Sequence, residues 1–139
     1  MTNYRPRIAD QLLADLLDAC GCVLIEGSKW CGKTTTAEKI ANSVVYMADP
    51  AEGERNRQLA KATPNYLLQG DTPRLIDEWQ VVPTLWDAIR GEVDHRRALG
   101  QFIITGSAVP PQRDEIVHTG TGREACQAFH ISVLYLIWE

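Results

Sequence analysis

A run of residues near the start of the chain has the types and the spacing of a phosphate-binding loop. The run fits the pattern G-x-x-x-x-G-K-[ST] and reads Gly27, Ser28, Lys29, Trp30, Cys31, Gly32, Lys33 and Thr34. Glycine lets the backbone approach a polyphosphate closely, and the loop N–H groups, with the positive end of the following helix, attract an anion. In this pattern the Lys33 ammonium contacts the β- and γ-phosphates, and the Thr34 hydroxyl takes one coordination position on Mg²⁺.

The sequence on both sides of this loop predicts the elements that would hold it in place. Residues 22–26 form a short apolar run typical of a buried strand, and residues 34–42 carry Ala37, Ile40 and Ala41 at helical spacing. The alternative interpretation is a glycine turn that joins a strand to a helix and binds nothing. Strand, loop and helix in this order are the context that phosphate binding needs, so the pattern favours the phosphate loop.

A second reactive group lies in residues 74–80, where a short strand is predicted to end in the adjacent acids Asp77 and Glu78. In phosphate-loop ATPases such a strand lies beside the first one, and its aspartate reaches the magnesium shell. Asp77 would hold Mg²⁺ directly or through water, and Glu78 would orient and polarise the attacking water as a general base. The alternative is a solvated acidic turn, which the upstream phosphate loop makes the weaker interpretation.

Hydroxyl and arginine side chains follow in two further segments. Residues 101–107 predict a buried strand that ends in the hydroxyls of Thr105 and Ser107, and the carboxyl ends of parallel strands share the ligand side of a sheet. These hydroxyls would contact the γ-phosphate or the attacking water, with ordinary turn chemistry as the alternative. Arg123 lies in a glycine-spaced segment; an arginine finger accelerates phosphoryl transfer by about 10³–10⁵-fold, whereas a solvated arginine would do nothing.

Length and composition predict one globular domain over residues 1–139, with an N-terminal arm and helix in residues 1–20. The net charge of -4 argues against a strongly basic nucleic-acid surface, although a local patch stays open. The spacing of the 4 cysteines fits neither a zinc site nor a disulfide framework, so we expect reduced thiols in a cytoplasmic protein. The longest apolar run, residues 133–138, is too short to span a membrane.

The remaining segments alternate between strand and helix patterns, which predicts a parallel α/β sheet with right-handed crossovers. We expect a helix over residues 9–20, a strand over 44–47 and a polar helix over 51–62 whose main apolar anchor is Leu59. Turns are expected at residues 63–65 and 70–73, and a helix begins near Pro83.

Taken together, these segments resemble the ATPase domain of the prokaryotic AAA-type ATP-binding proteins that carry a C-terminal domain of unknown function. The resemblance runs from Tyr4 to Arg123, and its most specific segments are residues 29–36, 72–80, 85–87, 100–108 and 118–123. It implies the three-layer α/β fold of P-loop NTPases, with a mostly parallel central sheet. It also implies that the chain binds the cofactors ATP and Mg²⁺.

The resemblance assigns roles to individual residues of the first two motifs. ATP would be bound by Gly32, Lys33, Thr34 and Thr35. Asp77 would be the magnesium aspartate, and Glu78 would be the catalytic glutamate.

The resemblance also implies a sensor and an arginine finger. Thr105 or Ser107 would read the γ-phosphate, and Arg123 would act across the subunit interface of a homo-oligomer. Two departures from the family pattern matter. Ser28 stands where the family often has proline, and residues 124–139 depart from the usual continuation. The apolar residues 131–138 would either form a last strand or belong to unrelated sequence.

These observations predict an ATPase domain that binds Mg-ATP and hydrolyses it. Two other functions stay open on the same residues. A small-molecule kinase would use the acids Asp77 and Glu78 to bind an acceptor hydroxyl, and a non-hydrolysing module would hold nucleotide and act through partner contacts. The destination of the phosphate, either water or an acceptor, separates these possibilities.

Overall fold

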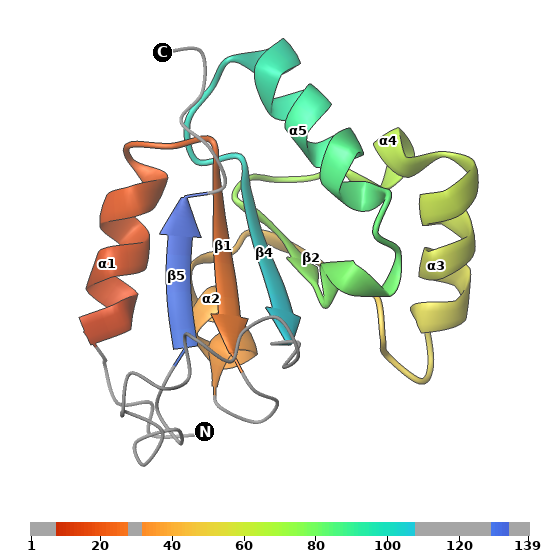
Figure 1. Ribbon diagram of the computed structural model, residues 1–139, viewed down its shortest axis with the longest axis horizontal. Helices are drawn as coiled ribbons and strands as arrows, with labels where there is room; N and C mark the ends of the chain where they lie inside the picture. Colours follow the sequence, from red (N-terminus) through yellow and green to blue (C-terminus); the bar gives the residue numbers. More distant parts are fainter. Residues whose placement is uncertain (1–7, 28–31, 108–128, 134–139) are drawn as a thin grey trace, which may run out of the picture.

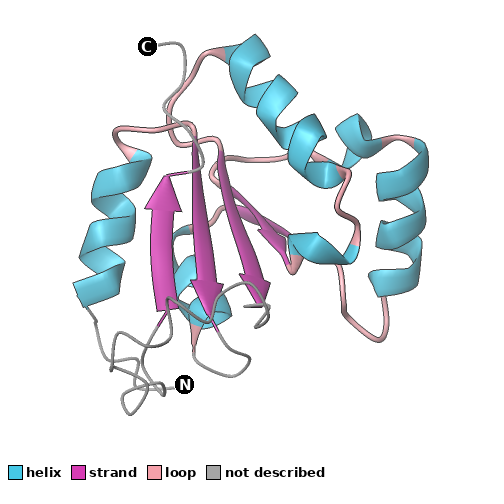
Figure 2. Ribbon diagram, in the orientation of Figure 1, coloured by secondary structure: helices cyan, strands magenta, loops and turns pink. Residues whose placement is uncertain are grey.

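A computed structural model describes residues 8–27, 32–107 and 129–133 of the chain. All of its strands belong to one sheet, which lies between two groups of helices (Figures 1 and 2). In chain order, the elements are α1 (Ile8–Leu17), β1 (Cys22–Gly27), α2 (Lys33–Ile40), β2 (Ser43–Tyr46), α3 (Gly53–Ala62), α4 (Pro64–Leu67), β3 (Arg74–Asp77), the 3-10 helix η1 (Trp79–Val81), α5 (Leu85–Arg96), β4 (Phe102–Ser107) and β5 (Phe129–Val133).

The sheet is mostly parallel, as the sequence predicts. Its strand order is β2-β3-β4-β1-β5, and the first four of these strands run parallel. β5 is antiparallel to β1, and its arrow points opposite to those of β1 and β4 in Figure 1. Its register aligns Val23 with Val133 and Gly27 with Phe129. The sequence left open whether the tail forms a last strand. Residues 129–133 do form a strand of this sheet, and it begins two residues before the expected segment 131–138.

Strict alternation along the strands builds a separate hydrophobic core on each face of the sheet. Successive strand residues point to opposite faces, so one face of β1 and β4 presents Leu24, Phe102 and Ile104, and the other presents Val23 and Ile103. The first face packs against α3, α4 and α5, and the second packs against α1 and α2. This arrangement confirms the predicted three-layer α/β fold.

The expectation that the strand carrying Asp77 lies beside the first strand is wrong. β4 lies between them and pairs with both β1 and β3. The physical reason is the apolar character of β4 on both faces, since Phe102, Ile103 and Ile104 are all fully buried. A strand of this kind is most stable in the middle of a sheet. Its central position places Thr105 between the end of β1 and the end of β3.

Two helical segments also differ from the sequence-based expectations. The predicted turn at residues 63–65 is instead the start of α4, where Pro64 occupies a first-turn position that needs no N–H. In α3 the buried residues are Gly53, Asn56 and Ala60, whereas Leu59 is only partly buried. A Cβ at Gly53 would lie 3.1 Å from the Met47 carbonyl oxygen, so glycine there lets α3 pack closely on the chain that leaves β2.

Replacing Phe102 with alanine should lower the free energy of unfolding by about 3–5 kcal/mol, because it opens a cavity in the core beneath α5. The Phe102 ring is fully buried and also lies 5.2 Å from the Arg96 guanidinium carbon. Urea denaturation measures the change. The control is Leu99→Ala, which should change stability by no more than about 0.5 kcal/mol because Leu99 is 49% exposed. Equal losses in both variants would contradict this account of the core.

Candidate functional site

The start of α2 places the basic and hydroxyl groups of the predicted phosphate loop. Gly32 has a φ of 96°, a left-handed conformation that glycine adopts without strain, and the helix begins at the next residue. Lys33 is only 3% exposed, so its long side chain lies within the fold rather than in solvent. Gly27 ends β1 directly before the loop. The predicted contacts of Ser28, Lys29, Trp30 and Cys31 lie outside the described residues and stay predictions.

Asp77 joins three segments of the chain through one carboxylate oxygen. Its Oδ1 accepts a hydrogen bond of 2.7 Å from the Thr34 hydroxyl of α2 and another of 2.7 Å from the Thr105 hydroxyl of β4. Thr105 is fully buried and its oxygen also accepts a 3.0 Å hydrogen bond from the backbone N–H of Glu78. The ends of α2, β3 and β4 are therefore held together at this acid.

Glu78 lies just past the end of β3 in a left-handed conformation, with φ 62° and ψ 54°. This backbone is uncommon for a non-glycine residue, and it turns the chain so that both acids face the site, as the sequence predicts. The Glu78 carboxylate accepts hydrogen bonds from the Ser107 hydroxyl at 3.1 and 3.3 Å and from the Gln80 amide at 2.7 Å. Its Oε2 also lies 3.8 Å from the Lys33 ammonium.

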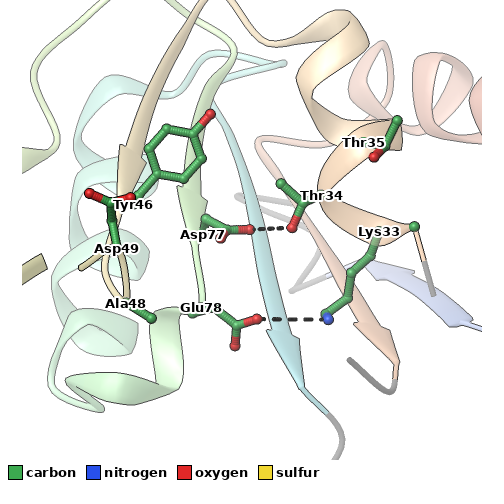
Figure 3. Close-up of a pocket in the computed structure, with 9 residues that line it drawn as sticks. Lys33, Thr34, Thr35, Tyr46, Ala48, Asp49, Asp77 and Glu78 are labelled. Atoms are coloured by element: carbon green, nitrogen blue, oxygen red, sulfur yellow. Dashed lines mark hydrogen bonds and ion pairs between the residues drawn. The ribbon is translucent and has the colours of Figure 1, made fainter. Parts of the chain in front are cut away.

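These side chains border a cavity of about 470 Å³, which Figure 3 shows between α2 and the ends of β2 and β3. The cavity is lined by Gly32, Lys33, Thr34, Thr35, Tyr46, Ala48, Asp49, Asp77 and Glu78. The structure thus brings the predicted phosphate-loop residues and both acids to one place. Lys33 and Glu78 point toward each other across the site, as do Thr34 and Asp77 (Figure 3).

Sequence reasoning missed several residues of this site. Tyr46, Ala48 and Asp49 line its far side, beyond Asp77. The signal was available, because the rule that parallel strands end on the ligand side applies to β2 as well as to β3. Gln80 was also missed, although it contacts Glu78 directly.

Thr105 and Ser107 lie where they support the acids. Thr105 bonds to Asp77 and to the backbone of Glu78, and Ser107 bonds to the Glu78 side chain. Their predicted role in reading a γ-phosphate stays a prediction. Arg123, the predicted arginine finger, lies outside the described residues.

The donor set at Thr34 and Asp77 fits magnesium. Mg²⁺ is commonly held by one or two protein oxygen ligands, with phosphates and water completing the octahedron. The hydroxyl and the carboxylate oxygens are hard ligands that already lie 2.7 Å apart. Within the described part of the chain, there is no group of three or more His, Cys, Asp or Glu residues that could hold a metal ion.

The comparison with protein families decides what kind of domain this is. The model of a family described as AAA domain matches residues 21–135, from the residue before β1 to just beyond β5. The chain belongs to the AAA domain family. Comparison with curated proteins found no match, and neither did comparison with solved structures. AAA domains are nucleotide-binding domains, so this membership indicates a nucleotide as the ligand. No helix among the described residues is long and apolar enough to cross a membrane.

Titration of Tyr46 tests its hydrogen bond to Glu38 at the wall of the cavity. Its hydroxyl donates a hydrogen bond to the Glu38 carboxylate, and this bond, with burial and nearby carboxylates, raises the pKa of Tyr46 to about 12. A raised pKa means that the bond supports the fold below the ordinary tyrosine pKa of about 10 and is lost as the pH rises toward 12.

We expect wild type and Tyr46→Phe to show the same tyrosinate absorbance up to about pH 10.5, because Tyr46 is still protonated there. Glu38→Gln removes the charged acceptor, so Tyr46 should then ionise at lower pH. A Tyr46→Phe variant that loses one tyrosinate equivalent near pH 10 would contradict the assigned hydrogen bond.

Proposed function

We propose that this AAA domain binds Mg-ATP and hydrolyses it to ADP and phosphate at the cavity between α2 and β3. The observation that carries the proposal is the convergence of a buried ammonium, a hydroxyl and two carboxylates, from Lys33, Thr34, Asp77 and Glu78. Phosphoryl transfer depends mainly on positioning and on charge stabilisation, and these groups supply both.

Lys33 is the group that would recognise the β- and γ-phosphates. It is 3% exposed and its ammonium lies 3.8 Å from Glu78 Oε2. A bound triphosphate would give this cation a second and more highly charged anionic partner. If the Lys33 ammonium then moved toward the phosphates, the Glu78 carboxylate would lose this partner and could interact with the attacking water. Thr34 and Asp77 would hold the magnesium ion, which supplies positive charge for the β- and γ-phosphate oxygens.

Glu78 would act as the general base that orients and polarises the attacking water. Such a base needs a fixed carboxylate within hydrogen-bond reach of the water. The Ser107 hydroxyl and the left-handed backbone of Glu78 fix the carboxylate at the end of β3. Thr105 supports the same turn, since it links the Glu78 N–H to the Asp77 carboxylate.

Replacing Lys33 with alanine should weaken Mg-ATP binding by about 10- to 100-fold, because it removes charge-assisted hydrogen bonds to the phosphates. Calorimetric titration of Mg-ATP into the purified chain measures the dissociation constant. Lys39→Ala is the matched control, since Lys39 is an exposed lysine near the other end of α2. A folded wild-type chain that binds no Mg-ATP would overturn the proposal.

Replacing Glu78 with glutamine should lower phosphate release by about 10²–10⁴-fold, while the affinity for ATP stays within about threefold. The reason is that the amide keeps the shape of the side chain but cannot accept a proton from water. Glu54→Gln is the control, because Glu54 is exposed on α3.

Wild-type turnover no faster than that of Glu78→Gln would make this a binding module without hydrolysis. Phosphate transferred only to an added alcohol, and not to water, would make it a kinase.

A further inference from the structure

Gln80 makes the shortest hydrogen bond that the structure gives to Glu78. Its amide Nε2 lies 2.7 Å from Glu78 Oε1, and both side chains are partly buried. A carboxylate can only accept hydrogen bonds, so the nitrogen end of the amide must face it. Hydrogen bonds to an ionised acceptor are shorter and stronger than neutral ones, which makes this contact a firm constraint on the Glu78 side chain.

The other end of the same amide has no partner. Gln80 Oε1 is buried, and no donor within the described part of the chain reaches it. An unsatisfied buried acceptor is unfavourable and calls for an explanation. Flipping the amide would not help, because it would put a carbonyl oxygen against the Glu78 carboxylate. The orientation of Gln80 is therefore set by Glu78, and the fold tolerates an unpaired oxygen to keep that contact.

A glycine in β4 allows η1 to bring Gln80 to this place. A Cβ at Gly106 would lie 2.9 Å from Trp79 Nε1 and 3.0 Å from Gln80 Oε1, so a larger residue there would press on both of these side chains. The Trp79 ring also packs on Trp86 of α5, with ring centroids 4.9 Å apart. Trp79 thus anchors the turn on α5, and Gly106, between Thr105 and Ser107, leaves room for the side chains of the turn.

The two oxygens of the Glu78 carboxylate have different surroundings. Oε1 is held by Gln80 at 2.7 Å and by Ser107 at 3.1 Å. Oε2 has the longer Ser107 contact of 3.3 Å and faces the Lys33 ammonium at 3.8 Å. Gln80 itself is not among the residues that line the cavity. Oε1 is therefore held by two hydrogen bonds, whereas Oε2 faces Lys33.

We propose that Gln80 is a positioning residue that holds Glu78 Oε1, so that Oε2 is presented to the water that attacks ATP. This inference rests on the proposed hydrolysis. Gln80 acts through Glu78 and does not contact nucleotide. Its loss should therefore slow turnover without weakening ATP binding, and only while Glu78 is present as a carboxylate.

A double-mutant cycle in the full chain tests this role. Gln80→Met keeps the approximate length of the side chain but removes the donor, and it should lower kcat by about 10- to 100-fold with KM and ATP affinity unchanged. In the Glu78→Gln background, the same substitution should have no further effect on residual turnover, measured with enzyme in excess. Gln58→Met is the matched control, because Gln58 donates a comparable 3.0 Å hydrogen bond to Glu54 on the exposed face of α3.

The outcomes distinguish the positioning role of Gln80 from the proposed ATP hydrolysis on which it rests. An equal fold loss in both backgrounds, or a weaker ATP affinity, would mean that Gln80 is merely structural and would overturn only the positioning role. A wild-type chain that binds ATP but does not hydrolyse it would overturn the hydrolysis proposal and the positioning role together. If Gln80→Met melts at a much lower temperature, Gln80→Leu replaces it, since this apolar side chain also lacks the donor; full kcat in Gln80→Leu would overturn the inference.

Discussion

The site depends on one oxygen atom of Asp77. Its Oδ1 accepts hydrogen bonds from Thr34 and Thr105, which lie on α2 and β4, and these segments are far apart in the sequence. Each bond has an ionised acceptor and is partly buried, where such bonds are stronger than in water. Because three segments share this atom, α2 is held next to the strand that carries the acids.

The constraint at Asp77 exists only because β4 is the central strand. Both faces of β4 are apolar, so pairing on both edges and packing on both faces are favourable for it. Thr105 is thereby buried with its hydroxyl directed at Asp77 and at the Glu78 N–H. The uncommon backbone of Glu78 is then supported by a defined partner, which is how a fold sustains local strain at a functional position.

Sequence reasoning placed the local strands and helices and failed where the arrangement depends on distant pairing. The strands before Gly27 and Asp77 and the helix after Gly32 follow from patterns of a few residues, and they bring Lys33, Asp77 and Glu78 to one cavity. The place of β4 depends on how strands compete for the centre of a sheet, which spacing does not record. Gln80 lies only two residues after Glu78, but residue spacing does not record that its amide turns back to the Glu78 carboxylate. Tyr46 could have been found by applying the strand-end rule to β2.

The arrangement separates the groups that would bind nucleotide from those that would use it. Lys33 and Thr34 belong to α2, whereas Glu78, Gln80 and Ser107 belong to the turn after β3 and the end of β4. The contact of 3.8 Å between Lys33 and Glu78 directly links the two sets. A triphosphate that draws Lys33 toward itself would weaken this link and so free Glu78 for its proposed role as a base. Hydrogen bonds from the Gln80 amide and the Ser107 hydroxyl would then hold the carboxylate without competing for the phosphate, because both of these groups are neutral.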